Sequence, residues 1–140
     1  MDTVRRVDYY YTTAPDKPGE GARVLSVFRD TAVNLLAFHA FPSARRTQLD
    51  FVPLDGPAFV ATAKAAKIKL SKPKAVFHFE GDDRVGAMAG ILGKLAAAGL
   101  NATASEAVCT TSGRYAGLLW VEPRDVKKAA QALGLTSQHP

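Results

Sequence analysis

Cysteine is almost absent from this chain of 140 residues, because Cys109 stands alone and no internal disulfide can form. Long apolar runs are missing as well, and none approaches the roughly 20 residues that a membrane-spanning helix needs. The first residues, MDTVRRVDYYY, lack the apolar stretch of a secretory signal. With 47% hydrophobic residues and no low-complexity tract, the chain is expected to fold around a core. We therefore expect a protein without a membrane partner, located in the cytoplasm.

Motifs for metal binding and catalysis are also missing. Two of the three histidines, His39 and His78, lie in predicted strands, and His139 lies in the C-terminal tail. No HxxH, HExxH or CxxC spacing is present, nor a GxSxG elbow, a P-loop or a GxGxxG turn after a strand. Cys109 ends a predicted strand, where a small apolar residue is the common interpretation. The sequence predicts a non-catalytic protein that uses no metal and no cofactor.

The positive charge is concentrated in one segment. The net charge of +5 favours anionic partners only mildly. Much of it comes from KAAKIKLSKPK, which carries Lys64, Lys67, Lys69, Lys72 and Lys74. A basic run beside a proline is typical of a solvated connector, so we expect a linker here.

The chain matches itself at an offset of 67 residues. The identities that matter are Asp16 with Asp83, Gly19 with Gly86, Leu25 with Leu92, and Asn34 with Asn101. Apolar positions also coincide without a gap, among them Val24 with Ile91, Phe28 with Leu95, Phe51 with Leu118, Val52 with Leu119, and Phe59 with Val126. Identity and apolar pattern together indicate a duplication.

Each copy shows the same order of elements. Strands are predicted at 4–12, 33–41 and 47–54 in the first copy, and at 74–80, 100–108 and 115–122 in the second. Helices are predicted at 19–31 and 56–67, then from Met88 to Gly99 and at 123–134. A short last strand is expected at 68–70 and another near Leu135.

This order defines the expected fold class. Strand, helix, strand, strand, helix, strand is the ferredoxin-like unit, an antiparallel sheet with both helices on one face. We predict an α+β fold of two such βαββαβ units in tandem, with domains at 3–71 and 72–137. A unit of about 65 residues is marginal alone, which favours packing of the two copies.

The start of the first helix, PDKPGEGARVL, is unusual. Asp16 is a suitable N-cap, and Pro18 fits the first turn. Gly19 and Gly21 then remove side chains from the turn whose N–H groups have no partner inside the helix. Each glycine weakens a helix by roughly 1 kcal/mol relative to alanine. We interpret the turn as a place where a ligand approaches the backbone.

With Asp-x-Pro-Gly at a strand-to-helix turn and Val-Asn before the next strand, the sequence resembles tandem ACT domains over residues 3–135. The residues that carry the resemblance are Asp16, Pro18, Gly19, Ala22, Val24, Leu25, Val33 and Asn34, then Asp83, Gly86, Ala89, Ile91, Leu92, Gly99, Leu100 and Asn101. Val85 replaces the proline of the second copy, and Gly21 replaces a leucine-like residue that Met88 supplies. ACT domains are small regulatory modules that bind amino acids, usually between paired domains.

The resemblance implies a ligand site in each copy. In the first, Asp16, Pro18, Gly19, Gly21 and Asn34 would bind the ligand, and the turn would lie near Asn34. The second set is Asp83, Val85, Gly86 and Asn101. Helix N–H groups suit a carboxylate, while Asp16 or the Asn34 carbonyl would accept from an ammonium group.

Structural interpretations of the same residues stay open. Asp16 and Asp83 would then cap helices, Asn34 would tie the start of its strand, and Arg84 would be a solvated charge.

Other functions also stay open. A purely structural pair is one, and an RNA-binding module is another, because Tyr9 and Tyr11 alternate along a strand. The basic residues expected nearby are Arg5, Arg6, Arg45 and Arg46. The return strands TQLDFVPL and YAGLLWVE lack the pattern of an RNA-binding strand, which disfavours nucleic acid. We expect an amino-acid sensor that forms a homodimer or acts on an unidentified target protein.

Overall fold

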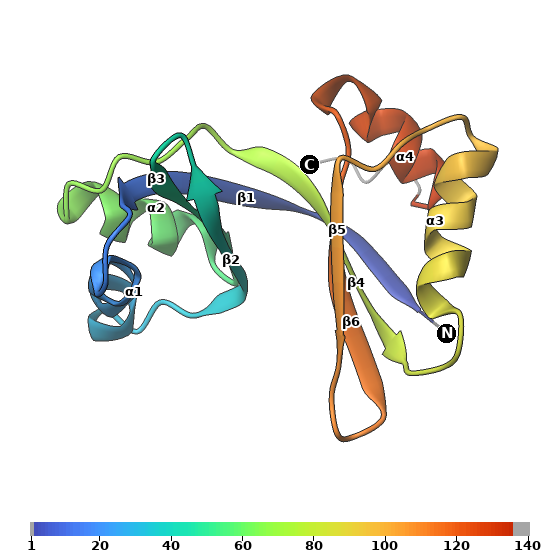
Figure 1. Ribbon diagram of the computed structural model, residues 1–140, viewed down its shortest axis with the longest axis horizontal. Helices are drawn as coiled ribbons and strands as arrows, with labels where there is room; N and C mark the ends of the chain where they lie inside the picture. The colour runs from blue at the N-terminus through green and yellow to red at the C-terminus, as the bar shows by residue number, and fades with distance from the viewer. Residues whose placement is uncertain (1, 136–140) are drawn as a thin grey trace. The chain divides into compact units, whose positions relative to one another are not determined.

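The computed structural model describes residues 2–135, which form an α+β fold of six strands, four α-helices and one short 3-10 helix (Figure 1). The elements follow one another as β1 (Thr3–Pro15), α1 (Glu20–Asp30), β2 (Leu35–Ser43), β3 (Arg46–Pro53), α2 (Gly56–Ala65), β4 (Lys74–Asp82), α3 (Ala87–Ala97), β5 (Ala104–Cys109), β6 (Arg114–Trp120), η1 (Pro123–Asp125) and α4 (Val126–Ala132). The predicted α+β class is confirmed. None of the helices within residues 2–135 has the length and apolar character needed to cross a membrane.

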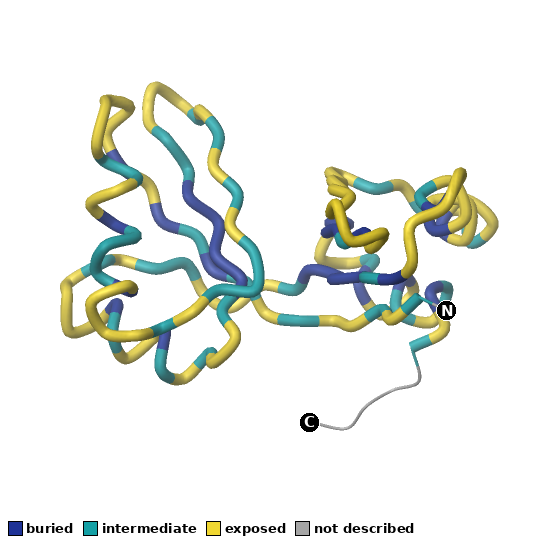
Figure 2. The backbone as a smooth tube through the Cα atoms, turned by 90° about the horizontal axis from the view of Figure 1, so that it is seen from below, coloured by how far each residue is buried: buried dark blue, intermediate teal, exposed yellow. Residues whose placement is uncertain are grey.

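The chain divides into two compact units. The middle unit is Asp8–Lys74, and the terminal unit combines Met1–Val7 with Ala75–Pro140, of which residues 2–7 and 75–135 are described. The buried positions in each unit gather on strands and on the inner sides of the helices (Figure 2).

In the middle unit the strands are ordered β2-β3-β1 and all pairs are antiparallel. Side chains alternate across a strand, so Tyr10 and Ala14 face the helices while Tyr9 and Tyr11 face the other way. Helices α1 and α2 cover that face, and the rings of Phe28 and Phe59 stack with centroids 4.4 Å apart. The buried core consists of Tyr10, Ala14, Val24, Phe28, Leu49, Phe51, Phe59 and Ala63.

In the terminal unit the order is β1-β4-β6-β5, with α3 and α4 over one face. Phe77 and Phe79 of β4 and Leu119 of β6 are almost completely buried in its core. Strand β5 is exposed along its whole length, as an edge strand can be.

The first residues of the chain belong to the terminal unit, not to the copy that follows them. Strand β1 is 13 residues long, and its second half, from Tyr10 to Pro15, pairs with β3. Its first residues lie with β4, and Val4 packs against the core of the terminal unit. The compact units therefore differ from the predicted domains 3–71 and 72–137, because one long strand changes partner halfway along.

The lysine-rich segment is part of the middle unit, so the linker prediction is wrong. Ile68 and Leu70 pack against the core, and the backbone follows β1. The strand predicted at 68–70 does not form, because the segment shares only one main-chain hydrogen bond with β1, from Ser71 N to Tyr11 O at 2.8 Å. The amide of Tyr11 is occupied by the Ser71 hydroxyl instead, at 3.0 Å. The strand expected near Leu135 falls at the limit of the described residues.

The ungapped alignment of the two copies is wrong in the return strands. Phe51 and Leu119 lie in the two core clusters, whereas Val52 and Leu118 are buried outside them. The alignment paired Phe51 with Leu118, and a shift of one residue moves a side chain to the other face of a strand. The hairpins explain it: Pro42 pairs with Thr47 across four residues, whereas its counterpart Cys109 pairs with Tyr115 across five, so the second hairpin holds one extra residue.

Candidate functional site

The turn before α1 has an open backbone but no capping side chain. Helix α1 has Gly19 as its N-cap, in the left-handed region at φ 91°, where glycine is favoured. A Cβ added at Gly19 or Gly21 would meet no atom within 4 Å, so the space around both is open. Asp16 lies too early to cap the helix, and its carboxylate accepts a hydrogen bond from the Thr47 hydroxyl at 3.2 Å. The capping role predicted for Asp16 is wrong, and Pro18 is exposed beside it.

The turn before α3 repeats this backbone. Gly86 is the N-cap of α3 at φ 82°, again without a side-chain cap, and Val85 is fully exposed. Asp83 is therefore not a cap either. Its amide donates to Gly113 O at 2.9 Å, and its carboxylate accepts from the Cys109 thiol at 3.2 Å. That bond raises the pKa of Cys109, which disfavours the reactive thiolate.

Arg84 is partly exposed to solvent, and it also forms an ion pair with the side chain of Asp2, which the sequence interpretation did not include. Its guanidinium donates two hydrogen bonds to the Asp2 carboxylate, at 2.9 and 2.8 Å. It also lies over the ring of Tyr115, 5.8 Å from the centroid. The hydrogen bond from Arg84 lowers the pKa of Asp2 to about 2.

Asp16 and Asn34 do not come together. Asp16 follows Pro15, which pairs with Arg46 at the first residue of β3. The backbone carbonyl of Asn34 accepts from Leu54, which follows the last residue of β3. At about 3.4 Å per residue, the two ends of this strand are roughly 20–25 Å apart. The predicted proximity is wrong because β2 starts at the opposite end of the sheet from the turn.

The asparagines also have local explanations. The side-chain carbonyl of Asn34 accepts a hydrogen bond from Leu35 N at 2.9 Å, which ties the start of β2. In the second copy, Asp83 follows the residue that pairs with Arg114, whereas Asn101 lies three residues before Ala104, which pairs with Trp120. These are again the two ends of one strand, β6. A ligand at either turn therefore cannot reach the asparagine of the same copy.

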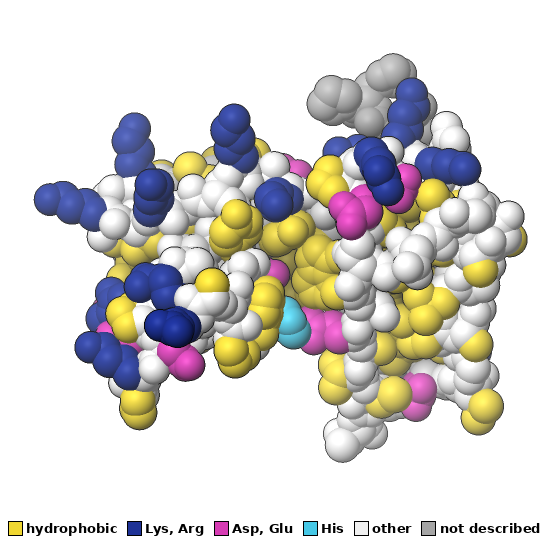
Figure 3. Space-filling view, turned by 45° about the horizontal axis from the view of Figure 1, so that its top comes forward, with side chains coloured by type: hydrophobic (Ala, Val, Ile, Leu, Met, Phe, Trp, Pro, Cys, Tyr) yellow, Lys and Arg dark blue, Asp and Glu magenta, His cyan; other side chains and the backbone are white. Residues whose placement is uncertain are grey.

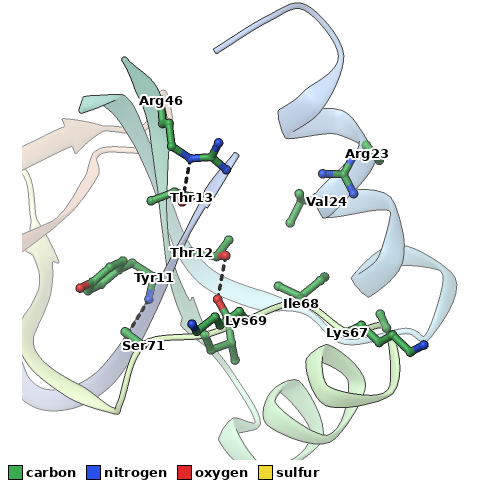
Figure 4. Close-up of a pocket in the computed structure, with 12 residues that line it drawn as sticks. Tyr11, Thr12, Thr13, Arg23, Val24, Arg46, Lys67, Ile68, Lys69 and Ser71 are labelled. Carbon is green, nitrogen blue, oxygen red and sulfur yellow. Dashed lines mark hydrogen bonds between the residues drawn. The ribbon is translucent and has the colours of Figure 1, made fainter. Parts of the chain in front are cut away.

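A hollow of about 510 Å³ opens in the middle unit between β1, α1, the start of β3 and residues 66–71 (Figure 4). Its lining comprises the cations Arg23, Arg46, Lys67 and Lys69, the hydroxyl-bearing Tyr11, Thr12, Thr13 and Ser71, and the apolar Val24, Ala66, Ile68 and Leu70. No carboxylate is among them.

Hydrogen bonds fix the walls of the hollow. Arg46 Nε donates to Thr13 Oγ1 at 3.1 Å, and Thr12 Oγ1 donates to the carbonyl of Lys69 at 2.8 Å. Arg23, on the opposite side, forms an ion pair with Glu20 at 2.8 Å. Figure 4 shows Arg46 and Arg23 extending toward one another across the hollow.

The hollow was missed at the level of sequence. Its only signals were the lysine run, interpreted as a linker, and Arg46, considered only for RNA binding. It lies at the same end of the middle unit as the first turn, because Arg46 adjoins Thr47, which bonds Asp16, and Arg23 is one helical turn beyond Gly19.

No protein-family model matches this chain, and no curated protein does. Solved structures do resemble it. Protein BT0572 from Bacteroides thetaiotaomicron has a TM-score of 0.79 at 18% identity, with 93% of this chain and 88% of that one covered. The regulatory subunit of aspartate kinase from Thermus thermophilus, in a ligand-free form, has a TM-score of 0.63 at 14% identity, covering 99% and 98%.

A third structure, of aspartokinase alpha and beta subunits, has a TM-score of 0.60 at 18% identity, with 94% and 93% covered. At such identities the likeness is one of fold. The chain has an ACT-like fold, the fold of aspartate kinase regulatory subunits.

Proposed function

We propose that this protein is a non-catalytic regulatory module that binds a small amino acid at the turns before α1 and α3. The observation that carries the proposal is the fold shared from end to end with a regulatory subunit, over 99% of this chain and 98% of the other.

The turn before α1 has the chemistry for an amino acid. The N–H groups of the first turn and the positive end of the helix dipole favour the ligand carboxylate. Gly19 and Gly21 leave that approach open, and Pro18 fixes the backbone before it. The carboxylate of Asp16 would accept from the ammonium group. Asn34 would instead contact a ligand held by another turn, since its own turn is too distant.

The turn before α3 would use equivalent groups. Gly86 leaves the N-terminus of α3 open in the same way, and Val85 offers an exposed apolar contact. Asp83 would accept from the ammonium group, although it already accepts from Cys109. Asn101, like Asn34, would serve a ligand at a different turn.

We also propose that the protein arose by duplication, with copies at 3–71 and 72–137. Backbone geometry supports this, because positive φ angles recur 67 residues apart. The pairs are Gly19 with Gly86, Ala32 with Gly99, and Lys67 with Gly134. Conserved turn geometry beneath different side chains is what a duplication would leave.

The ligand would regulate by shifting the protein between conformations, or between assemblies, that bind it with different affinity. A homodimer or a target protein in the cytoplasm would carry the output.

Thermal unfolding of the full chain against each of the twenty amino acids tests the proposal. A ligand at about 100 times its Kd stabilises a fold by roughly 2.7 kcal/mol, which raises Tm by several degrees. Gly19→Val should abolish that rise, because its side chain would cover the first-turn N–H groups.

Gly99→Val is the matched control. Gly99 also has a positive φ, of 73°, and open space around it, but it follows the end of α3. Both variants carry similar backbone strain, so loss of the ligand response in Gly19→Val alone would assign the first turn. No response to any amino acid in a well-folded protein would refute the proposed ligand class.

A further inference from the structure

The hollow of the middle unit carries charge that its own surroundings do not neutralise. Of its four cations, Arg23 has an acidic partner, Glu20. Arg46 makes its one hydrogen bond through Nε, so neither terminal nitrogen of its guanidinium bonds to any part of the chain that the structure describes. Figure 3 shows further Lys and Arg side chains gathered on the surface of this unit.

This charge does not match an amino acid. A zwitterion has one carboxylate and an ammonium group, and the hollow offers four cations and no carboxylate to accept from that ammonium. A ligand with at least two negative charges would balance the lining instead. The volume, about 510 Å³, lies in the range of small-molecule sites and exceeds what a single phosphate ion fills.

We propose that the hollow binds a phosphorylated small molecule that carries two or more negative charges. The donors suit phosphate oxygens. The guanidinium of Arg46 presents its two terminal nitrogens as a fork, the geometry that matches phosphate. Thr13 accepts from Arg46 through Oγ1, and its own hydroxyl proton has no acceptor in residues 2–135, so it can donate to the same ligand.

Lys67, which lines the hollow, has a strained backbone conformation. Lys67 follows α2 in the left-handed region, at φ 60°, where side chains other than glycine and asparagine are disfavoured. The position 67 residues later holds glycine, Gly134, at φ 83°. Ala32, at the end of α1, has a comparable φ of 56°, so this conformation belongs to the end of the helix, and Lys67→Gly is expected to relieve its strain.

The site is separate from the proposed amino-acid site. It is built from side chains of β1, α1, β3 and the 66–71 segment, and it uses none of the first-turn N–H groups of α1. Gly19→Val should therefore leave phosphate binding unchanged, so that the two proposals fail or succeed separately.

Isothermal titration of the full chain with tripolyphosphate, ATP, citrate and inorganic phosphate tests the inference. Tripolyphosphate and ATP should bind saturably at one site per chain, and inorganic phosphate at least tenfold more weakly. Binding should weaken as salt is raised, because the site is open to solvent. Citrate, which carries similar charge without phosphate, should also bind at least tenfold more weakly than tripolyphosphate.

A matched pair of double variants separates the hollow from general surface charge. Arg23→Gln with Arg46→Gln removes one arginine of α1 and one of the β2-β3 hairpin, both lining the hollow. Arg29→Gln with Arg45→Gln removes an α1 arginine paired with Asp30 and the neighbouring hairpin arginine, neither in the lining. The first pair should lose at least tenfold in tripolyphosphate affinity and the second less than threefold.

Lys67→Gly tests the proposal even if the double arginine variants fail to fold. It should raise Tm by relieving strain while it weakens tripolyphosphate binding, opposite changes that general destabilisation cannot produce. Equal losses in the two arginine pairs would overturn the proposal. So would equal binding of citrate, binding of an RNA oligonucleotide without binding of tripolyphosphate, or no binding of any probe.

Discussion

Gly117 occupies a position where a single methyl group has no room. It pairs with Phe79 across β4 and β6, and a Cβ there would fall 2.5 Å from Cζ of that ring and on the carbonyl oxygen of Glu106. In the middle unit the equivalent cross-strand pair is Thr12 with Leu49. At this pair the terminal unit thus has a large ring opposite a glycine, whereas the middle unit has the smaller Thr12 opposite a leucine.

The variant Gly117→Ala should therefore destabilise the protein. Overpacking costs about 1–3 kcal/mol, and the upper end applies because one obstacle is backbone and the other is a completely buried ring. Alanine recovers about 0.5–1 kcal/mol through its smaller conformational entropy when unfolded. A net loss of about 2 kcal/mol should lower Tm by roughly 5–10 °C.

Urea and thermal unfolding of the full chain measure this loss, with two comparison variants. Gly90→Ala lies in α3 with nothing within 4 Å, so it should stabilise by about 0.5–1 kcal/mol. Phe79→Leu should recover part of the loss when combined with Gly117→Ala, because it removes the ring. If Gly117→Ala matched or exceeded the wild type in stability, the packing argument would be refuted.

Three further variants test other parts of the structure. Asp2→Asn should destabilise at neutral pH, and the difference from wild type should vanish as pH falls from 3.8 to about 2, because the pKa of Asp2 is lowered in the folded state. Burial, with Arg5 adding to it, lowers the pKa of His78 below 6.5. The unfolded chain then binds more protons, so the free energy of unfolding should fall below pH 6.5, and urea titrations of His78→Leu should show a flatter dependence. Phe28→Ala should cost about 3–5 kcal/mol in urea unfolding, since this ring is 1% exposed and contacts the rings of Phe51 and Phe59.

Local patterns predicted the elements well. Apolar spacing placed the four helices within a few residues, and alternation placed the six strands. The glycines before α1 and α3 were also found, because a left-handed backbone conformation at the start of a helix favours glycine at that position. Asp16 was mistaken for the cap, since it matches the preferred residue type but lies three positions too early.

Long-range features were not predictable in the same way. The register of β6 depends on one extra residue in its hairpin, which an ungapped comparison cannot see. The hollow joins segments 11–13, 23–24, 46 and 66–71, whose proximity depends on the packing of α1 against the sheet. The sequence did not indicate that Arg46 lines the hollow, because an exposed arginine in a hairpin is common.

Strand β1 begins in the terminal unit and ends in the middle unit. The middle unit is therefore inserted within the sequence of the terminal unit. The chain enters this unit at Asp8 and leaves it at Lys74, whose ammonium group lies 5.3 Å from the ring of Tyr11, three residues after Asp8. Residues 8–74 form a continuous segment that carries its whole core. The terminal unit, by contrast, cannot be obtained as one piece of chain: a fragment beginning at residue 72 lacks the strand beside β4. During synthesis the first part of β1 must wait for its partner until β4, which ends at Asp82, has been made.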